Sequence, residues 1–76
     1  MYFDNMSMTQ KIRLLLVKQG NISEAELARR LGQTPQNFYH KMKRDNFSEE
    51  ELREIAAVMG CGVEINFINN ETGEKT

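Results

Sequence analysis

Hydrogen-bonding and basic side chains gather in the middle of this chain, between residues 28 and 44. The polar residues Gln36, Asn37, Tyr39 and His40 carry amide, phenol and imidazole groups that donate or accept hydrogen bonds. The segment also contains five basic residues and no acidic one: Arg29, Arg30, Lys41, Lys43 and Arg44. This composition favours recognition of a polar, negatively charged surface over bond-making chemistry.

The sequence offers no set of residues that would carry catalysis. His40 is the only histidine and Cys61 the only cysteine, so no multi-cysteine metal site or intrachain disulfide is expected. No nucleophile–base pair or glycine-rich phosphate loop is visible, and the core of a 76-residue chain leaves little room for a pocket. We therefore predict a protein that is not an enzyme, with no catalytic residues, no metal, no cofactor and no small-molecule ligand.

Charge is distributed unevenly along the chain. The net charge is -1, which alone argues against a polyanionic partner. Residues 28–44 nevertheless carry a charge of +5, whereas residues 45–76 carry -6 from eight acidic and two basic residues. A basic surface patch can therefore coexist with a slightly acidic total.

Four helices are expected between residues 7 and 60, because each has a start signal. Ser7 with Gln10, Ser23 with Glu26 and Ser48 with Glu51 have the spacing of a capping box. Thr34 is a suitable cap for the third helix, and Pro35 suits its first helical position. The first, second and fourth helices end at glycines: Gly20, Gly32 and Gly60.

The third of these helices, residues 34–43, has little apolar surface. Phe38 and Met42 lie four residues apart on one face, and the other faces are polar or charged. Such a helix presents much of its surface to a partner. For Tyr39 two placements are equally favoured: its side chain packs over the loop before the fourth helix, or it contacts the partner.

The pattern changes after Gly60. Val63, Ile65 and Phe67 alternate with polar residues, which predicts a β-strand over residues 62–68, followed by a polar tail over 69–76. A lone strand needs a hydrogen-bonding partner. Residues 1–6 could supply one within the chain, but we favour a second copy of the chain, paired about a two-fold axis.

Residues 24–43 are laid out as a helix-turn-helix. Ala-Arg-Arg-Leu-Gly at residues 28–32, followed by Gln-Thr-Pro-Gln-Asn-Phe at 33–38, resembles the core of the lambda-repressor-like (XRE-type) family. The resemblance covers about residues 7–60. It implies a mainly α, four-helix lambda-repressor-like helix-turn-helix domain, here a single domain over residues 1–76. A C-terminal β-strand would replace the family's fifth helix.

The resemblance implies a small bacterial or phage-encoded transcriptional regulator that binds double-stranded operator DNA through helix 34–43. As a homodimer joined by the C-terminal strand, it would read two half-sites about 34 Å, or a multiple of that distance, apart. The implied candidates for base contacts are Thr34, Pro35, Gln36, Tyr39 and His40. The implied candidates for phosphate contacts are Arg29, Arg30, Asn37, Lys41, Lys43 and Arg44.

A second function stays open: a protein-interaction module of the antitoxin or adaptor type on the same helical scaffold. In that case the acidic fourth helix and the C-terminal strand would contact another protein. No apolar run approaches the ~20 residues of a membrane span, and no signal peptide is recognisable at the N-terminus. We expect a cytoplasmic protein that has no membrane partner.

Overall fold

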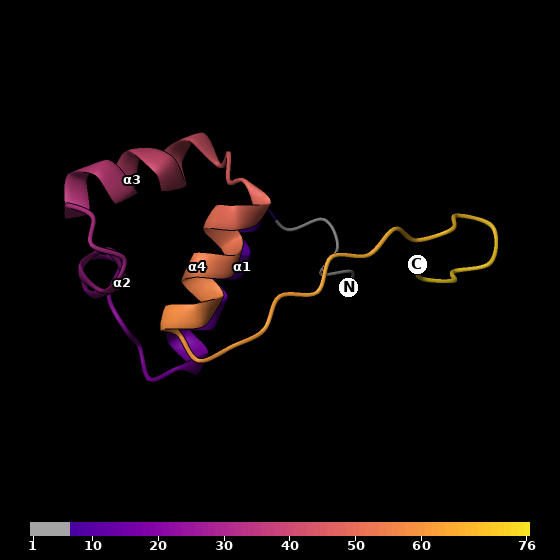
Figure 1. Ribbon diagram of the computed structural model, residues 1–76, viewed down its shortest axis with the longest axis horizontal. Coiled ribbons are helices and arrows are strands. Elements are labelled where there is room, and N and C mark those ends of the chain that lie inside the picture. The colour runs from indigo at the N-terminus through magenta and orange to yellow at the C-terminus, as the bar shows by residue number, and fades with distance from the viewer. Residues whose placement is uncertain (1–6) are drawn as a thin grey trace.

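Four helices make up about half of the chain. The computed structural model describes residues 7–76, and the prediction of a short strand or lead-in over residues 1–6 lies outside them. The helices are α1 (Met8–Lys18), α2 (Glu24–Arg30), α3 (Pro35–Arg44) and α4 (Glu49–Val58) (Figure 1). The prediction of a mainly α architecture with four helices is confirmed.

Each helix begins at the cap that the sequence predicts. The side chains of Ser7 and Ser48 accept hydrogen bonds from the backbone three residues on, and complete capping boxes form with Gln10 and Glu51. Thr34 caps α3, with Pro35 as its first residue. At α2 only half of the predicted box forms: Ser23 accepts from the Glu26 N–H, but the Glu26 carboxylate turns toward two arginines instead. The two guanidinium groups offer the carboxylate three hydrogen bonds and two positive charges, whereas the cap offers one neutral N–H, which accounts for the difference.

The turn between α2 and α3 is closed by a backbone motif that requires Gly32. Gly32 has a φ of 72°, a left-handed conformation in which any other residue is strained. Around it, the Gln33 N–H donates to the Ala28 carbonyl at 2.9 Å, and the Gly32 N–H to the Arg29 carbonyl at 3.0 Å. This is the Schellman pattern, which ends α2 and lets α3 begin only a few residues later.

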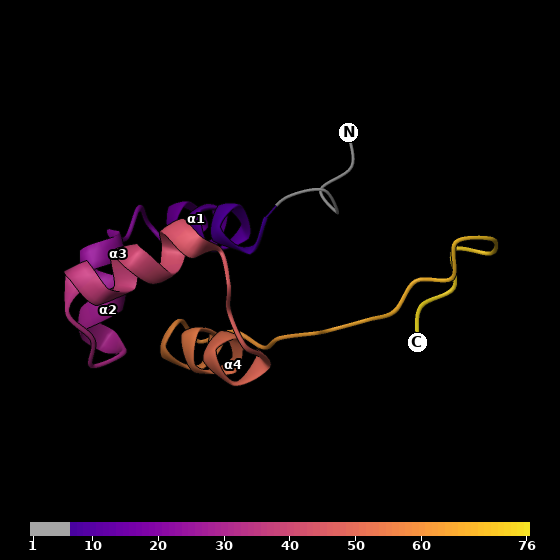
Figure 2. The ribbon, with the colours of Figure 1, turned by 90° about the horizontal axis from the view of Figure 1, so that it is seen from above.

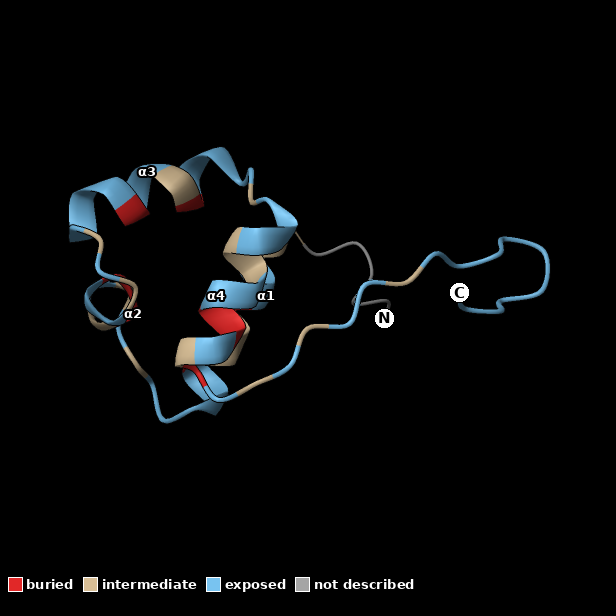
Figure 3. Ribbon diagram, in the orientation of Figure 1, coloured by how far each residue is buried: buried red, intermediate tan, exposed pale blue. Residues whose placement is uncertain are grey.

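One apolar core lies between the four helices. It is built from buried side chains of every helix and of the residue that follows α4: Ile12, Leu16, Leu27, Ala28, Phe38, Met42, Ile55 and Met59. Figure 2 separates α4 from a second layer that contains α1 and α3, with α2 at one end of the molecule. In α3 only Phe38 and Met42 are buried, so the predicted narrow apolar stripe is confirmed (Figure 3).

Thr9 and Asp45 tie the start of α1 to the end of α3. The Thr9 hydroxyl, which is 6 % exposed, donates to the Met42 carbonyl at 2.6 Å. The Thr9 N–H donates to an Asp45 carboxylate oxygen at 2.8 Å. Asp45 itself follows the last turn of α3 in the left-handed conformation, with a φ of 53°. These bonds fix the C-terminal end of α3, where its own sequence provides no buried side chain after Met42.

The predicted C-terminal strand over residues 62–68 is not present among the described residues. After Gly60 the chain is extended, and it leaves the helical body without pairing until Phe67 (Figure 2). Residues 67–76 then fold back on themselves, with Ile68 and Lys75 forming an isolated antiparallel bridge. The alternation of side chains predicts an extended backbone correctly, but a strand also needs a neighbour for its N–H and C=O groups.

Replacing Thr9 by valine tests the tie between α1 and α3. Valine keeps the shape of threonine but cannot donate to the Met42 carbonyl, so the free energy of unfolding should fall by about 1–2 kcal/mol. Urea denaturation followed by circular dichroism measures the change. Thr72→Val, in the exposed C-terminal segment, is the matched control and should have almost no effect. Equal stability of the two variants would show that the tie contributes nothing.

Candidate nucleic-acid interface

The outer face of α3 is polar, and most of it is exposed. All five side chains predicted to contact bases are exposed: Thr34, Pro35, Gln36, Tyr39 and His40. Three of the predicted phosphate-contacting residues are exposed on the same helix: Asn37, Lys43 and Arg44. Figure 3 shows α3 as largely exposed, with its buried positions on the side of α2 and α4. The structure therefore brings eight of the predicted site residues onto one surface.

Helix geometry divides this surface into two rows. Successive α-helical residues are rotated by about 100°, so residues three, four or seven apart share a side. Gln36 and Lys43 lie on one side with Tyr39, whose side chain is 54 % exposed and stacks edge-on against the His40 ring at 5.7 Å. His40 and Arg44 lie on the other side with Asn37. Each row thus combines hydrogen-bonding groups near the start of α3 with a cation near its end.

The cations at the end of α3 differ in their pairing. Lys41 forms an ion pair with Glu51, the residue that also completes the cap of α4. Lys43 and Arg44 have no ion-pair partner among residues 7–76. Lys43 and Arg44 are therefore available for an external anion, whereas Lys41 holds α3 against α4.

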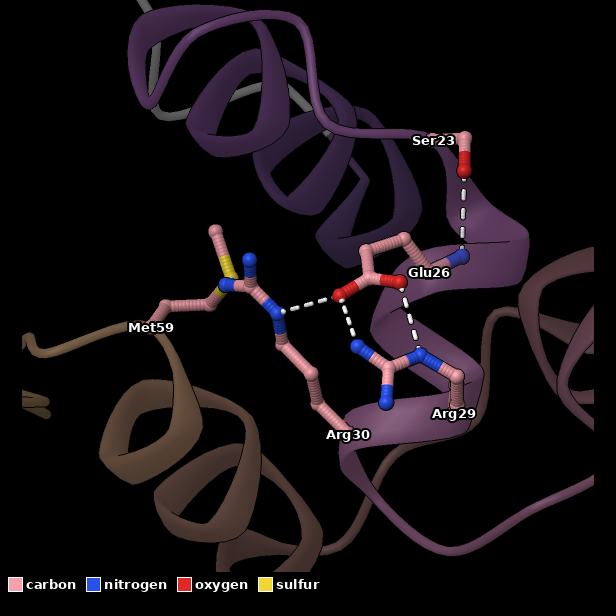
Figure 4. A network of polar contacts seen from close by, with 5 residues as sticks. All are labelled: Ser23, Glu26, Arg29, Arg30 and Met59. Carbon is pink, nitrogen blue, oxygen red and sulfur yellow. Dashed lines mark hydrogen bonds and ion pairs between the residues drawn. The ribbon is translucent and has the colours of Figure 1, made fainter.

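The two arginines of α2 share one carboxylate (Figure 4). The guanidinium group of Arg29 makes two hydrogen bonds to Glu26, of 2.8 and 2.6 Å, and Nε of Arg30 makes one of 2.9 Å. Arg30 also reaches across to the Met59 sulfur, 3.7 Å away, and so points toward the end of α4. The hydrogen bonds from Arg29 and then Arg30 lower the pKa of the Glu26 carboxyl from 4.5 to about 2. The Glu26 carboxylate in turn raises the pKa of Arg29.

The structure thus separates Arg30 and Lys41 from the other predicted phosphate contacts. Arg29 is intermediate, since its side chain is paired but still 73 % exposed. Sequence reasoning placed Glu26 and Glu51 only in capping boxes and missed their ion pairs, and it missed the roles of Thr9 and Asp45. The i,i+3 and i,i+4 spacing of Glu26 to the two arginines was a signal for the first pair. The Lys41–Glu51 pair joins two helices and has no local signal.

Metal-ligand clusters and membrane-spanning helices are both absent from the part of the chain that the structure describes. Across residues 7–76, no group of three histidine, cysteine, aspartate or glutamate side chains is placed to hold a metal ion. None of the four described helices is long and apolar enough to cross a membrane.

The pairing of Glu26 predicts a pH dependence of stability. Because the folded-state pKa is lowered, the Glu26 ion pairs contribute fully above about pH 4.5, and their contribution is lost as the pH falls toward about 2. Glu26→Gln should therefore lower the melting temperature at pH 6, and the difference from wild type should shrink steadily down to pH 2. Circular dichroism melts across this range measure it.

The control for this experiment is Glu54→Gln. Glu54 is an exposed acid of α4 that has no ion-pair partner within residues 7–76. Its substitution reports the effect of removing one negative charge without breaking a pair. A Glu26→Gln difference that stays constant with pH, or that matches Glu54→Gln throughout, would contradict the assigned pairing.

Relationships to other proteins give no independent assignment. Comparisons of the chain with protein-family models, with curated proteins and with solved structures find no match. The resemblance to the XRE-type family stays a prediction that rests on residues 28–38.

Proposed function

We propose that the protein binds double-stranded DNA in a sequence-dependent manner and acts as a small transcriptional regulator of the lambda-repressor-like kind. The observation that carries the proposal is the surface of α3, where Gln36, Tyr39, His40, Lys43 and Arg44 are all exposed. The helix-turn-helix layout of α2 and α3 supports it, because this motif inserts its second helix into the major groove. In this proposal the protein acts in the bacterial cytoplasm and is encoded by the bacterium or by a phage.

Within this proposal the start of α3 reads base edges. The Gln36 side chain carries an amide donor and acceptor, which match the two groups that adenine presents in the major groove. Tyr39 and His40 lie one turn further on and face the flanking base pairs or the sugar–phosphate backbone. Thr34 and Pro35 contact a thymine methyl group or a phosphate at the entry to the groove.

Phosphate contacts fall to the unpaired cations. Lys43 and Arg44 neutralise phosphates on the two sides of the groove, with Asn37 as a neutral hydrogen-bond donor between helix and backbone. Arg29 adds to them from α2, since most of its side chain is exposed. Arg30 and Lys41 have a structural role in this scheme, because each is bound to a residue within the protein.

Fluorescence anisotropy with random-sequence duplex DNA tests the phosphate contacts. Wild-type binding should weaken steeply as salt increases, and Lys43→Ala should reduce the slope of log K against log salt by about 0.9 on any sequence. Lys41→Ala is the matched control on the same helix. It should lower thermal stability through loss of the Glu51 pair while it leaves the salt slope unchanged.

Site selection from a random DNA pool tests the base contacts. Gln36→Ala should bind the selected site roughly 5- to 100-fold more weakly, with almost unchanged affinity for random DNA. Lys18→Ala, at the last residue of α1 and outside the proposed interface, should change neither quantity. Absence of salt-sensitive binding at low ionic strength would overturn the proposal and favour a protein-interaction module instead.

A further inference from the structure

An apolar groove lies beside the helical body, on the side where the C-terminal segment departs. It has a volume of about 430 Å³ and runs between α1, α4 and residues 61–65. Its apolar lining comes from three parts of the chain: Met8 and Leu15, Leu52 and Ile55, and Val63 and Ile65. The groove is therefore partly built from the same extended segment that leads away from it.

The C-terminal segment carries apolar side chains that its own chain does not cover. Phe67 is 82 % exposed and Ile65 51 % exposed, which are high values for large apolar residues. Among residues 7–76, the backbone groups of residues 62–66 form no backbone hydrogen bond. One segment thus supplies a rim of the groove, an exposed aromatic side chain and an unpaired strand edge.

We propose that the occupant of this groove is Phe67 of a second copy of the chain, delivered by antiparallel pairing of residues 62–68 about a two-fold axis at Ile65. A two-fold interface requires one surface that is complementary to itself. The C-terminal segment meets this requirement, because each copy carries both the groove and the Phe67 side chain that fills the groove of the other.

The hydrogen bonds of the terminal turn identify the free edge. Phe67 exchanges backbone hydrogen bonds with Thr76 at 2.9 and 2.8 Å, so its N–H and C=O face the fold-back of its own chain. Backbone groups alternate between the two edges of an extended segment. Those of Glu64 and Asn66 therefore face the opposite edge, which is open to a second copy.

Side-chain pairing then fixes the register. Opposite residues of antiparallel strands share a face, so a two-fold axis through a residue keeps apolar side chains together. With the axis at Ile65, Ile65 faces its own copy, Val63 faces Phe67, and Glu64 faces Asn66. An axis at Glu64 would place two carboxylates opposite each other. An axis at Asn66 would leave Val63 opposite the polar Asn69.

This register brings Phe67 to the groove. Glu64 and Asn66 become the hydrogen-bonded pair, so Val63 and Phe67 form a non-hydrogen-bonded pair, in which side chains approach most closely. Val63 lines the groove of its own copy. Phe67 of the partner subunit therefore lies next to Val63, over the apolar side chains of α1 and α4. Dimer formation through this segment requires no DNA.

The first test is the oligomeric state of the full chain without DNA. Sedimentation velocity over a concentration series should show a dimer. Phe67→Ser should raise the dimer dissociation constant on the order of 100-fold or more, with an unchanged melting profile of the helical core. A protein that stays monomeric at every concentration would overturn the proposal, also if residues 1–6 of the same chain were found to cover the segment. A dimer that Phe67→Ser leaves intact would overturn it as well.

The second test measures the register by disulfide formation in a Cys61→Ser background. In this register the Cα atoms of the two residues 65, one in each copy, lie about 4.5 Å apart, within the Cα–Cα range that a disulfide spans. Residue 66 of one copy lies opposite residue 64 of the other, so the two residues 66 are diagonal neighbours. They lie about 7–8 Å apart, beyond that range. Ile65→Cys should therefore cross-link under mild oxidation, and Asn66→Cys should not. Equal cross-linking of both, or of Asn66→Cys alone, would refute the register.

Discussion

The scarcity of buried surface on α3 is the constraint to which the rest of the structure responds. Only Phe38 and Met42 anchor this helix in the core, since its other side chains are exposed or, like Lys41, half-buried. Phe38 and Met42 are among the largest fully buried side chains of the described residues, so their packing anchors the middle of the helix. Polar contacts add to this at the two ends: the Schellman turn at Gly32 positions the start of α3, and the Thr9 and Asp45 bonds hold its C-terminal end.

The acidic residues fit into the same scheme. Glu26 binds the two arginines of α2, and Glu51 serves both the cap of α4 and Lys41 of α3. Negative charge is thus used inside the helical scaffold, where it neutralises cations that would otherwise repel each other. Lys43 and Arg44 receive no such partner among residues 7–76, so the net charge of -1 understates the positive character of the outer face of α3.

Much of the fold was predictable because its signals are local. Ser7, Ser23, Thr34 and Ser48 cap the helices as their spacing indicates, and the four-residue spacing of Phe38 and Met42 correctly predicted the buried side of α3. The exposure of the predicted base-contacting residues also followed from periodicity alone.

The features that sequence reasoning missed depend on distant residues. Thr9 was missed because its bond crosses from one end of α1 to the end of α3, 33 positions later. The Lys41–Glu51 pair was missed because it joins two helices. The prediction of a strand over residues 62–68 was wrong for this structure. Alternation of side chains indicates an extended backbone but does not indicate which segment, if any, pairs with it.

The bond between Thr9 and Met42 has a consequence for how the protein can change over generations. Its acceptor is a main-chain carbonyl, which every residue type possesses, and the Schellman turn before α3 likewise uses only backbone atoms. These two contacts therefore do not depend on which side chains occupy the outer face of α3. Substitutions at Gln36, Asn37 or His40 can accumulate there without loosening the helix, so a lineage can change the chemistry of this exposed face while it keeps the same scaffold.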